Sequence, residues 1–362
     1  MSMEIIAFYL PQYHPTPHND EWWGEGFTEW TNVAKAKPFF CGHYQPKIPS
    51  SLGFYDLRIP EVREKQVELA VKAGVTCFCY YHYWFGDGHV ELELPFNEVV
   101  KSGEPDFPFM LCWANETWSR KFWNKDGTIV DSKLLAEQKY LGEEDDIKHF
   151  YTLLPAFKDK RYLRIDGKLA FMIYRPLSFV EMKRFIDLWQ KLAKENGLEG
   201  FHFMGFSFKP DQEGGDFLNL GLDAVVAYRH NRDFFHNWKW AFRKIFSIVF
   251  RLPRVQSYKK IWPPLISDKE QNDEQYYPVM LPNWDHTPRS GHNGDVLIGS
   301  TPEEFEKHCI DVLSKIKNKK HDICFLKSWN EWGEGNYMEP DLKYGKGYIH
   351  ALRNAINKET KK

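Results

Sequence analysis

Residues 323–340 read ICFLKSWNEWGEGNYMEP. The stretch opens with a short apolar run, residues 323–326, which is typical of a buried strand. Gly333, Gly335 and Pro340 then break regular structure, so the acids among them lie on a loop just past the carboxyl end of that strand. A buried strand that ends in polar residues is the repeating unit of a parallel α/β fold whose sites lie at the strand ends.

This loop carries three carboxylates, Glu331, Glu334 and Glu339, beside Trp329 and Trp332. Aromatic faces pack against the C–H faces of sugars, carboxylates accept hydrogen bonds from hydroxyl groups, and paired carboxylates can cleave an acetal. The alternative is a polar turn that closes the core. We disfavour it because solvated turns seldom combine tryptophan and acids so densely. The loop therefore predicts a carbohydrate site.

Composition sets further bounds. The chain has 362 residues, 43% of them hydrophobic, which is enough for one large core, and we expect a single barrel domain over residues 1–362. The net charge of −2 gives no electrostatic sign of nucleic-acid binding. Aromatic residues make up 17% of the chain and include 14 tryptophans, a surplus that suits an oligo- or polysaccharide partner.

Cysteine usage and the amino-terminal residues indicate a reduced, cytoplasmic protein. Cys77, Cys79, Cys112 and Cys324 lie in apolar runs, where cysteine acts as a small buried hydrophobe. No second cysteine pair or nearby histidine cluster completes a metal set, so we expect neither a metal nor a cofactor. Residues 1–4 lack the features of a signal peptide, and no apolar run is long enough to span a bilayer.

Seven more strand-like runs precede the one at 323–326. They cover residues 3–10, 75–84, 107–115, 169–174, 201–208, 222–228 and 277–284. Helical patterns lie between them, at residues 60–74, 91–102, 143–159, 178–196, 302–319 and 344–357, with Ser178 and Thr301 as expected caps. Eight strands that alternate with helices predict a (β/α)8 TIM barrel with elaborated loops.

Polar and aromatic residues follow most of these strands. In a barrel, all the carboxyl ends of the strands meet at one face, where active sites form. Glu331 and Glu334 are the candidate catalytic pair. The candidate substrate-binding residues are Tyr9, Gln12, Tyr13, Trp30, His82, Trp84, Trp113, Asn115, Arg175, Trp284, Asn330, Trp332 and Glu339. For His82 a structural role is an equal alternative, and for Glu339 a role in anchoring the loop is an equal alternative to sugar contact. The aromatic segment 22–30 also fits a lid.

One segment is an insertion that a minimal barrel does not require. Residues 229–260, within an insertion at 229–275, contain nine lysines and arginines against one acid, Asp233, with aromatic residues interleaved. An ordinary amphipathic barrel helix is the favoured interpretation. The alternatives are peripheral contact with an anionic membrane, or with a lipid-linked or anionic saccharide.

The acidic loop also resembles a known one. Residues 329–332 (WNEW), followed by Glu334-Gly335 and Glu339-Pro340, are similar to the catalytic loop of glycoside hydrolase family 99. The resemblance is closer to the WbsX-type proteins of bacterial polysaccharide gene clusters. That similarity extends to residues 9–14 (YLPQYH) and 25–30 (EGFTEW).

The resemblance implies a retaining endo-α-mannosidase or mannanase that uses the 2-hydroxyl of the sugar as nucleophile, through a 1,2-anhydro intermediate. Glu331 would be the base on that hydroxyl, and Glu334 the general acid and then base at the glycosidic oxygen. Asn330 and the tryptophans would line the pocket. WbsX-type proteins are also labelled glycosyltransferases of O-antigen or capsule (lipopolysaccharide) biosynthesis. No Asp-x-Asp motif follows a strand, which argues against a metal-dependent nucleotide-sugar transferase. A non-catalytic glycan-binding protein is the third alternative.

Overall fold

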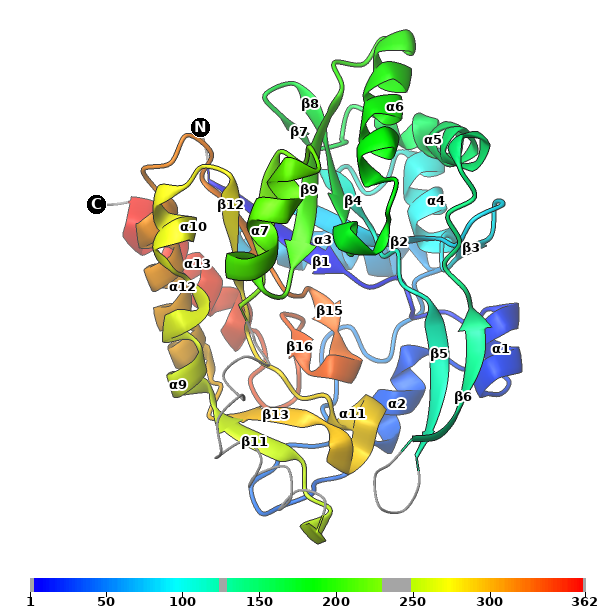
Figure 1. The fold of residues 1–362 in the computed structure, drawn as a ribbon. Coiled ribbons are helices and arrows are strands. Elements are labelled where there is room, and N and C mark those ends of the chain that lie inside the picture. Colours follow the sequence, from blue (N-terminus) through cyan, green and yellow to red (C-terminus); the bar gives the residue numbers. More distant parts are fainter. Residues whose placement is uncertain (1–2, 124–128, 230–248, 361–362) are drawn as a thin grey trace.

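The computed structural model describes residues 3–123, 129–229 and 249–360, and its centre is a closed barrel of eight parallel strands (Figure 1). The barrel closes because β1 pairs with β14 on one side and with β2 on the other. In order around the barrel the strands are β1 (Glu4–Tyr9), β2 (Cys77–Trp84), β4 (Phe109–Trp113), β8 (Lys168–Ile173), β9 (Phe201–Ser207), β10 (Ala224–Ala227), β12 (Tyr276–Met280) and β14 (Ile323–Leu326). The predicted TIM barrel is confirmed, and each predicted run overlaps one of these strands.

Helices surround the barrel (Figure 1). They are α3 (Pro60–Ala73), α4 (Leu94–Ser102), α5 (Glu143–Phe157), α6 (Met182–Glu195), α7 (Pro210–Asn219), α12 (Pro302–Ile316) and α13 (Gly347–Thr360). Helix α12 begins as predicted, because the Thr301 side chain accepts a hydrogen bond from the Glu304 amide. Helix α7 was not predicted.

Three predicted helix starts were wrong. Helix α13 begins at Gly347 rather than at residue 344. Helix α4 begins at Leu94 rather than at residue 91, because β3 (Val90–Glu91) first pairs with the end of β2. Helix α6 begins at Met182, because Pro176–Ser178 forms a separate 3-10 turn. Ser178 is therefore not its cap.

Several smaller elements extend the connections between strands and helices. They are α1 (Pro17–Trp23), α2 (Glu29–Lys35), β5 (Trp118–Trp123), β6 (Ile129–Ala136), β7 (Arg164–Ile165), β11 (Arg254–Ser257), α9 (Tyr258–Ile261), α10 (Asp268–Asn272), α11 (Thr287–Ser290), β13 (Asp295–Ile298), β15 (Asn330–Glu331) and β16 (Asn336–Tyr337). The antiparallel ribbon β5–β6, the helices α1, α2 and α11, and the pair β15–β16 lie on one side of the barrel, where its strands end (Figure 1). Both termini lie toward the other side.

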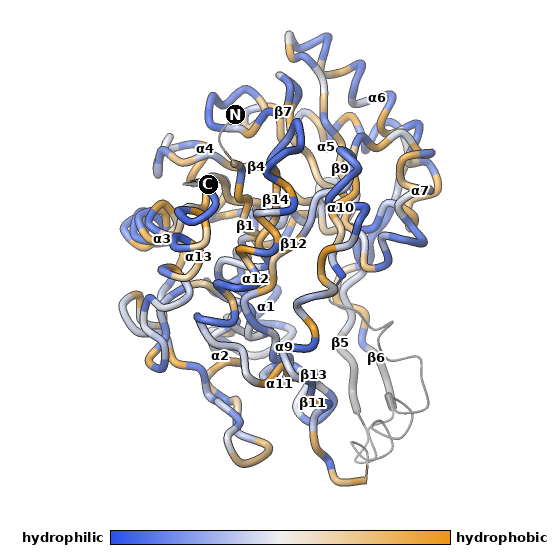
Figure 2. The backbone as a smooth tube through the Cα atoms, turned by 90° about the vertical axis from the view of Figure 1, so that its left-hand side faces the viewer, coloured by the Kyte–Doolittle hydropathy of each residue, from blue (hydrophilic) through white to orange (hydrophobic). Residues whose placement is uncertain are grey.

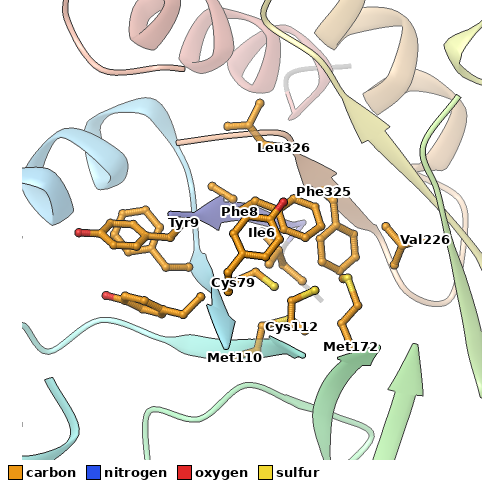
Figure 3. Packing of buried hydrophobic residues seen from close by; sticks show 14 of the residues in the cluster. Ile6, Phe8, Tyr9, Cys79, Met110, Cys112, Met172, Val226, Phe325 and Leu326 are labelled. Carbon is orange, nitrogen blue, oxygen red and sulfur yellow. The ribbon is translucent and has the colours of Figure 1, made fainter. Parts of the chain in front are cut away.

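Alternate residues of each strand face the barrel interior. Phe8, Cys112, Met172 and Phe325 point toward one another, whereas Tyr9 points out of this group (Figure 3). All five are almost completely buried, because the interior is filled by side chains and the outside is covered by helices. Strands such as β1 and β14 accordingly carry mostly hydrophobic colours, while helices α6 and α7 present many hydrophilic residues (Figure 2).

Residues 230–248 of the predicted basic segment 229–260 lie outside the described residues, so its predicted membrane or saccharide contact stays untested. At the edges of that gap, Arg229 pairs with Asp211 and Glu270, and Arg254 pairs with Asp295. No helix among the described residues is both long and apolar enough to cross a bilayer.

Gly205 in β9 is packed so closely that a larger side chain there should destabilise the protein. A Cβ atom there would lie 2.4 Å from Cδ2 of Phe217 and 3.0 Å from Cδ2 of Leu222. We expect Gly205→Ala to destabilise the protein by about 1–3 kcal/mol, measured as a lower thermal midpoint. Gly215→Ala is the matched control, because no heavy atom lies within 4 Å of its added Cβ and alanine favours a helix. Equal midpoints for the two variants would contradict this packing.

Candidate active site

A cavity of about 500 Å³ opens at the carboxyl end of the barrel. Its floor is built by strand alternation, because five of the barrel strands, β1, β2, β4, β8 and β14, contribute inward positions at or just past their carboxyl ends. The residues supplied in this way are Leu10, Tyr81, Tyr83, Ala114, Tyr174 and Lys327. Trp23 and Phe27 from the first loop and Trp118 from β5 form aromatic walls. The cavity therefore combines a floor fixed by the barrel with walls supplied by loops.

Glu331 and Glu334 both line this cavity. Arg289 Nη1 lies 2.6 Å from Oε1 of Glu334 and 3.4 Å from Oε1 of Glu331, so these two oxygens are no further apart than the sum of the two distances, 6.0 Å. Lys327 Nζ lies 2.9 Å from Oε2 of Glu331 and 3.8 Å from Oε2 of Glu334. The two predicted catalytic acids thus face one space and share two cations.

The loop conformation that brings the acids together depends on two glycines. Gly335 has φ +65°, and a Cβ there would lie 2.9 Å from the Asp285 amide nitrogen. A Cβ on Gly333 would lie only 1.8 Å from Oε1 of Glu29. Glycine avoids both conflicts because it has no Cβ. The chain can therefore turn from β15 through the 3-10 turn Trp332–Glu334 into β16, with Gly333 packed closely against Glu29.

Both cations remain charged in this setting. Burial alone would lower the pKa of Lys327, but Glu331 and Glu334 raise it above its usual value. Burial would likewise lower the pKa of Arg289, but the negative charges of Glu29, Glu334 and Glu331 raise it well above its usual value. Ser328 Oγ also donates to Oε2 of Glu331 at 3.0 Å. Glu331 is therefore held by three donors from two sides.

A third carboxylate and a histidine complete the polar floor. Arg289 Nε donates to Oε1 of Glu29 at 2.9 Å. His286 Nε2 lies 3.7 Å from Oε1 of Glu334, and burial followed by the charge of Arg289 lowers the pKa of His286 to about 4, so it is neutral at pH 7. Among the described residues, the charged groups that line the cavity are four glutamates, one arginine and one lysine. The cavity is acidic overall.

Four of these charged residues, Glu29, Glu116, Arg289 and Lys327, were missed by the sequence analysis. Glu116 directly follows the candidate Asn115. Glu29 lies within the aromatic segment 22–30, and Lys327 occupies the inward register after Phe325, so both had a signal in the sequence. Arg289 had none, because α11 reaches the cavity only through the long connection after β12.

Strand alternation places four predicted substrate-binding residues on the outer face of the barrel, not in the cavity. Tyr9 donates to Gln66 of α3 at 2.6 Å. His82 and Trp84 contact α5, at His149 and Asp145 respectively, and the Trp113 ring lies 5.4 Å from that of Phe185 on α6. The prediction treated the strand ends as one set, but residues one apart face opposite sides.

Four others form a layer beneath the acidic loop. Asn330 accepts from the Leu10 amide at 2.8 Å and donates to the Leu10 carbonyl at 2.9 Å. The Tyr13 hydroxyl donates to the Asn330 carbonyl at 2.5 Å and accepts from the Trp332 amide at 3.1 Å. Trp332 stacks on Tyr337 with ring centroids 3.7 Å apart, and Trp30 packs beside it. These side chains fix the loop that carries the acids.

Glu339 is the buried anchor of this layer. It accepts hydrogen bonds from Tyr55 Oη at 2.8 Å, Gln66 Nε2 at 2.6 Å and Trp332 Nε1 at 2.7 Å. Burial raises the pKa of Glu339 to about 7, although these three donors partly offset the shift. Its place matches the predicted alternative of a loop anchor.

The remaining candidates lie at or near the rim. Gln12 lines the cavity. Arg175 Nε donates to Oε1 of Glu116, a cavity residue, at 2.6 Å, and Asn115 accepts from the Arg175 amide at 2.8 Å. Trp284 stacks on His286, the neighbour of Glu334. Asn115, Arg175 and Trp284 do not line the cavity themselves.

Comparison with known proteins identifies the family. The family model described as "Glycosyltransferase WbsX" matches residues 5–352. The chain belongs to this family. It is also 34% identical, over 98% of its length, to the uncharacterized protein WxcX of Xanthomonas campestris pv. campestris, in strain B100 and in strain ATCC 33913. The chain spans about half the length of these curated relatives.

Solved structures share the fold. A family 99 (GH99) endo-alpha-mannosidase from Bacteroides thetaiotaomicron, bound to bis-tris-propane, has a TM-score of 0.59 at 14% identity, over 100% of this chain and 98% of that chain. The same enzyme in a second structure gives 0.57 at 16% identity, with the same coverage. A glycoside hydrolase-like protein gives 0.55 at 14% identity, over 98% and 94% of the two chains.

The buried Glu339 predicts a component of stability that depends on pH. Its folded pKa of about 7 exceeds the ordinary value of 4.5, so the folded state keeps a proton that the unfolded state releases. The stability from this proton is fully present below about pH 4.5 and is lost as the pH rises through about 7. We expect urea titrations to show that the free energy of unfolding of the wild type falls relative to that of Glu339→Gln as the pH rises from about 4.5 to about 7. Glu64→Gln, on the exposed face of α3, should show a constant difference; a constant difference for Glu339→Gln would contradict the shift.

Proposed function

We propose that the protein is a carbohydrate-active enzyme, a retaining glycoside hydrolase that acts on a bacterial oligo- or polysaccharide. The observation that carries the proposal is the pairing of Glu331 and Glu334 on shared cations at the floor of an aromatic-walled cavity. Acetal cleavage needs a proton for the leaving oxygen and a group that acts at the opposite side of the anomeric carbon. Two adjacent carboxyl groups supply both.

Different environments suit the two acids to different roles. The Glu331 side chain is 7% exposed and accepts from Lys327 and Ser328, so it is a fixed base for the sugar 2-hydroxyl. The Glu334 side chain is 14% exposed, so it is the acid that protonates the leaving oxygen. The 2-oxygen attacks the anomeric carbon as the glycosidic bond breaks. Water then attacks the anomeric carbon and Glu334 takes its proton, while the C1–O2 bond of the anhydro ring breaks and Glu331 returns its proton to the 2-oxygen. Two inversions at the anomeric carbon give retention.

The walls fit an uncharged sugar ring. Trp23, Phe27 and Trp118 offer aromatic faces, and the excess of glutamate favours hydroxyl groups over phosphate or carboxylate groups. The α-mannosidase neighbours make α-linked mannosides the first substrates to test.

A glycosyltransferase of O-antigen or capsule synthesis is the second candidate, and the family description favours it. In that reaction one of the acids would deprotonate an acceptor hydroxyl. The acidic lining of the cavity, among the described residues, disfavours a diphosphate-linked donor. A glycan-binding protein without catalysis is the third candidate, but binding alone does not require two acids on shared cations.

The proposal predicts that Glu334→Gln lowers kcat for glycoside cleavage by about 10²–10⁴-fold, because the amide cannot transfer a proton. The substrate Kd should stay within a few-fold, since the side chain keeps its shape. The measurement is release of reducing ends from α-mannan and from capsular or O-antigen fragments, with Kd from calorimetry.

Glu64→Gln is the control, because its side chain is exposed on α3, away from the cavity. Turnover of an activated donor sugar without any cleavage would assign the protein to the transferases. Binding without either reaction, and unchanged turnover in Glu334→Gln, would each remove the proposed acid–base role.

A further inference from the structure

Two histidines and a glutamate converge outside the cavity. His18 Nδ1 lies 2.5 Å and His89 Nε2 lies 2.7 Å from the same oxygen, Oε1 of Glu91. One ligand atom from each side chain lies within 4.8 Å of the other two. Among the described residues, no other group of three such side chains meets this criterion.

The fold brings the three together from separate segments. His18 is on α1, whereas His89 and Glu91 flank the start of β3, where residues two apart face the same side. Glu91 is held in place by its pairing with Tyr83 of β2. Because 71 residues separate His18 from His89, no local motif in the sequence reveals the group.

The chemistry of this set is that of a metal site. Two imidazole nitrogens and one carboxylate oxygen are a common ligand set for zinc and related divalent ions. Glu91 is only 5% exposed, and a buried carboxylate needs a compensating charge. Both imidazole nitrogens contact the same oxygen of Glu91, so the three potential ligand atoms are gathered in one place.

We propose that His18, His89 and Glu91 bind one divalent transition-metal ion of the zinc class. The His18 and His89 side chains are 52% and 39% exposed, which leaves the outer side of the ion open to water. This assignment does not depend on the proposed function, and it differs from the expectation from the sequence that the chain has no metal set.

The metal site would stabilise the wall of the cavity that contains Trp118. The His18 ring stacks on Trp22 at 5.4 Å, and the His89 ring packs on Phe85 at 5.2 Å. Trp22 and Phe85 both contact Trp118, which lines the cavity. An ion that joins α1 to the β2–β3 turn therefore fixes the position of this tryptophan without contacting a substrate.

The test uses the whole chain without a polyhistidine tag, stripped with a chelator and titrated with Zn²⁺ by calorimetry and with Co²⁺ by visible absorption. We expect one equivalent of metal, cobalt bands typical of imidazole and carboxylate ligands, and a higher thermal midpoint with Zn²⁺. His18→Asn, His89→Asn and Glu91→Gln should each weaken binding at least about 100-fold, since loss of even an outer partner costs 10–100-fold.

His350→Asn is the matched control, because this histidine is exposed on α13, far along the chain from the three ligands. His18→Asn tests the site without endangering the fold, since half of that side chain is already in solvent. Circular dichroism checks folding of every variant. Equal affinity in His18→Asn and His350→Asn, or no bound equivalent in wild type, would show that the three side chains form only a hydrogen-bonded group.

Discussion

Strand alternation inside a closed barrel is the constraint on which the site depends. A strand turns successive side chains to opposite faces, so one register fills the core and continues into the cavity floor. Two residues after the core side chains Phe8, Cys112 and Phe325, the same face of each strand carries the cavity residues Leu10, Ala114 and Lys327. The residues between them face the helices instead. The floor of the cavity thus continues the packing of the core beneath it.

On this floor, charge rather than backbone alone holds the acids in place. Lys327 comes from the end of a barrel strand and Arg289 from the loop after the previous one, and each contacts both Glu331 and Glu334. Like charges so close would repel each other, and the two cations offset that repulsion. Below them, Glu339 and its three donors fix the far end of the same loop. The acidic loop is therefore held at two levels, by ion pairs above and by hydrogen bonds below.

Much of this arrangement could be predicted from the sequence. The eight strands were recognisable because parallel barrel strands are apolar throughout, and the acid pair because two carboxylates among tryptophans on one loop are rare. The direction of each side chain was harder to predict. Trp84 and Trp113 are aromatic residues at strand ends and yet face α5 and α6. Arg289 and the His18–Glu91 contact depend on segments that meet only in three dimensions.

The ribbon β5–β6 and the first loop enclose the cavity without belonging to the barrel (Figure 1). The acid pair and the aromatic walls of the cavity are therefore encoded in separate stretches of the gene. Insertions or deletions within residues 17–27 or in the β5–β6 ribbon can reshape what the cavity accepts while the acid pair and its cations stay unchanged. Sequence differences among relatives should accordingly concentrate in those two stretches, and the floor should change slowly.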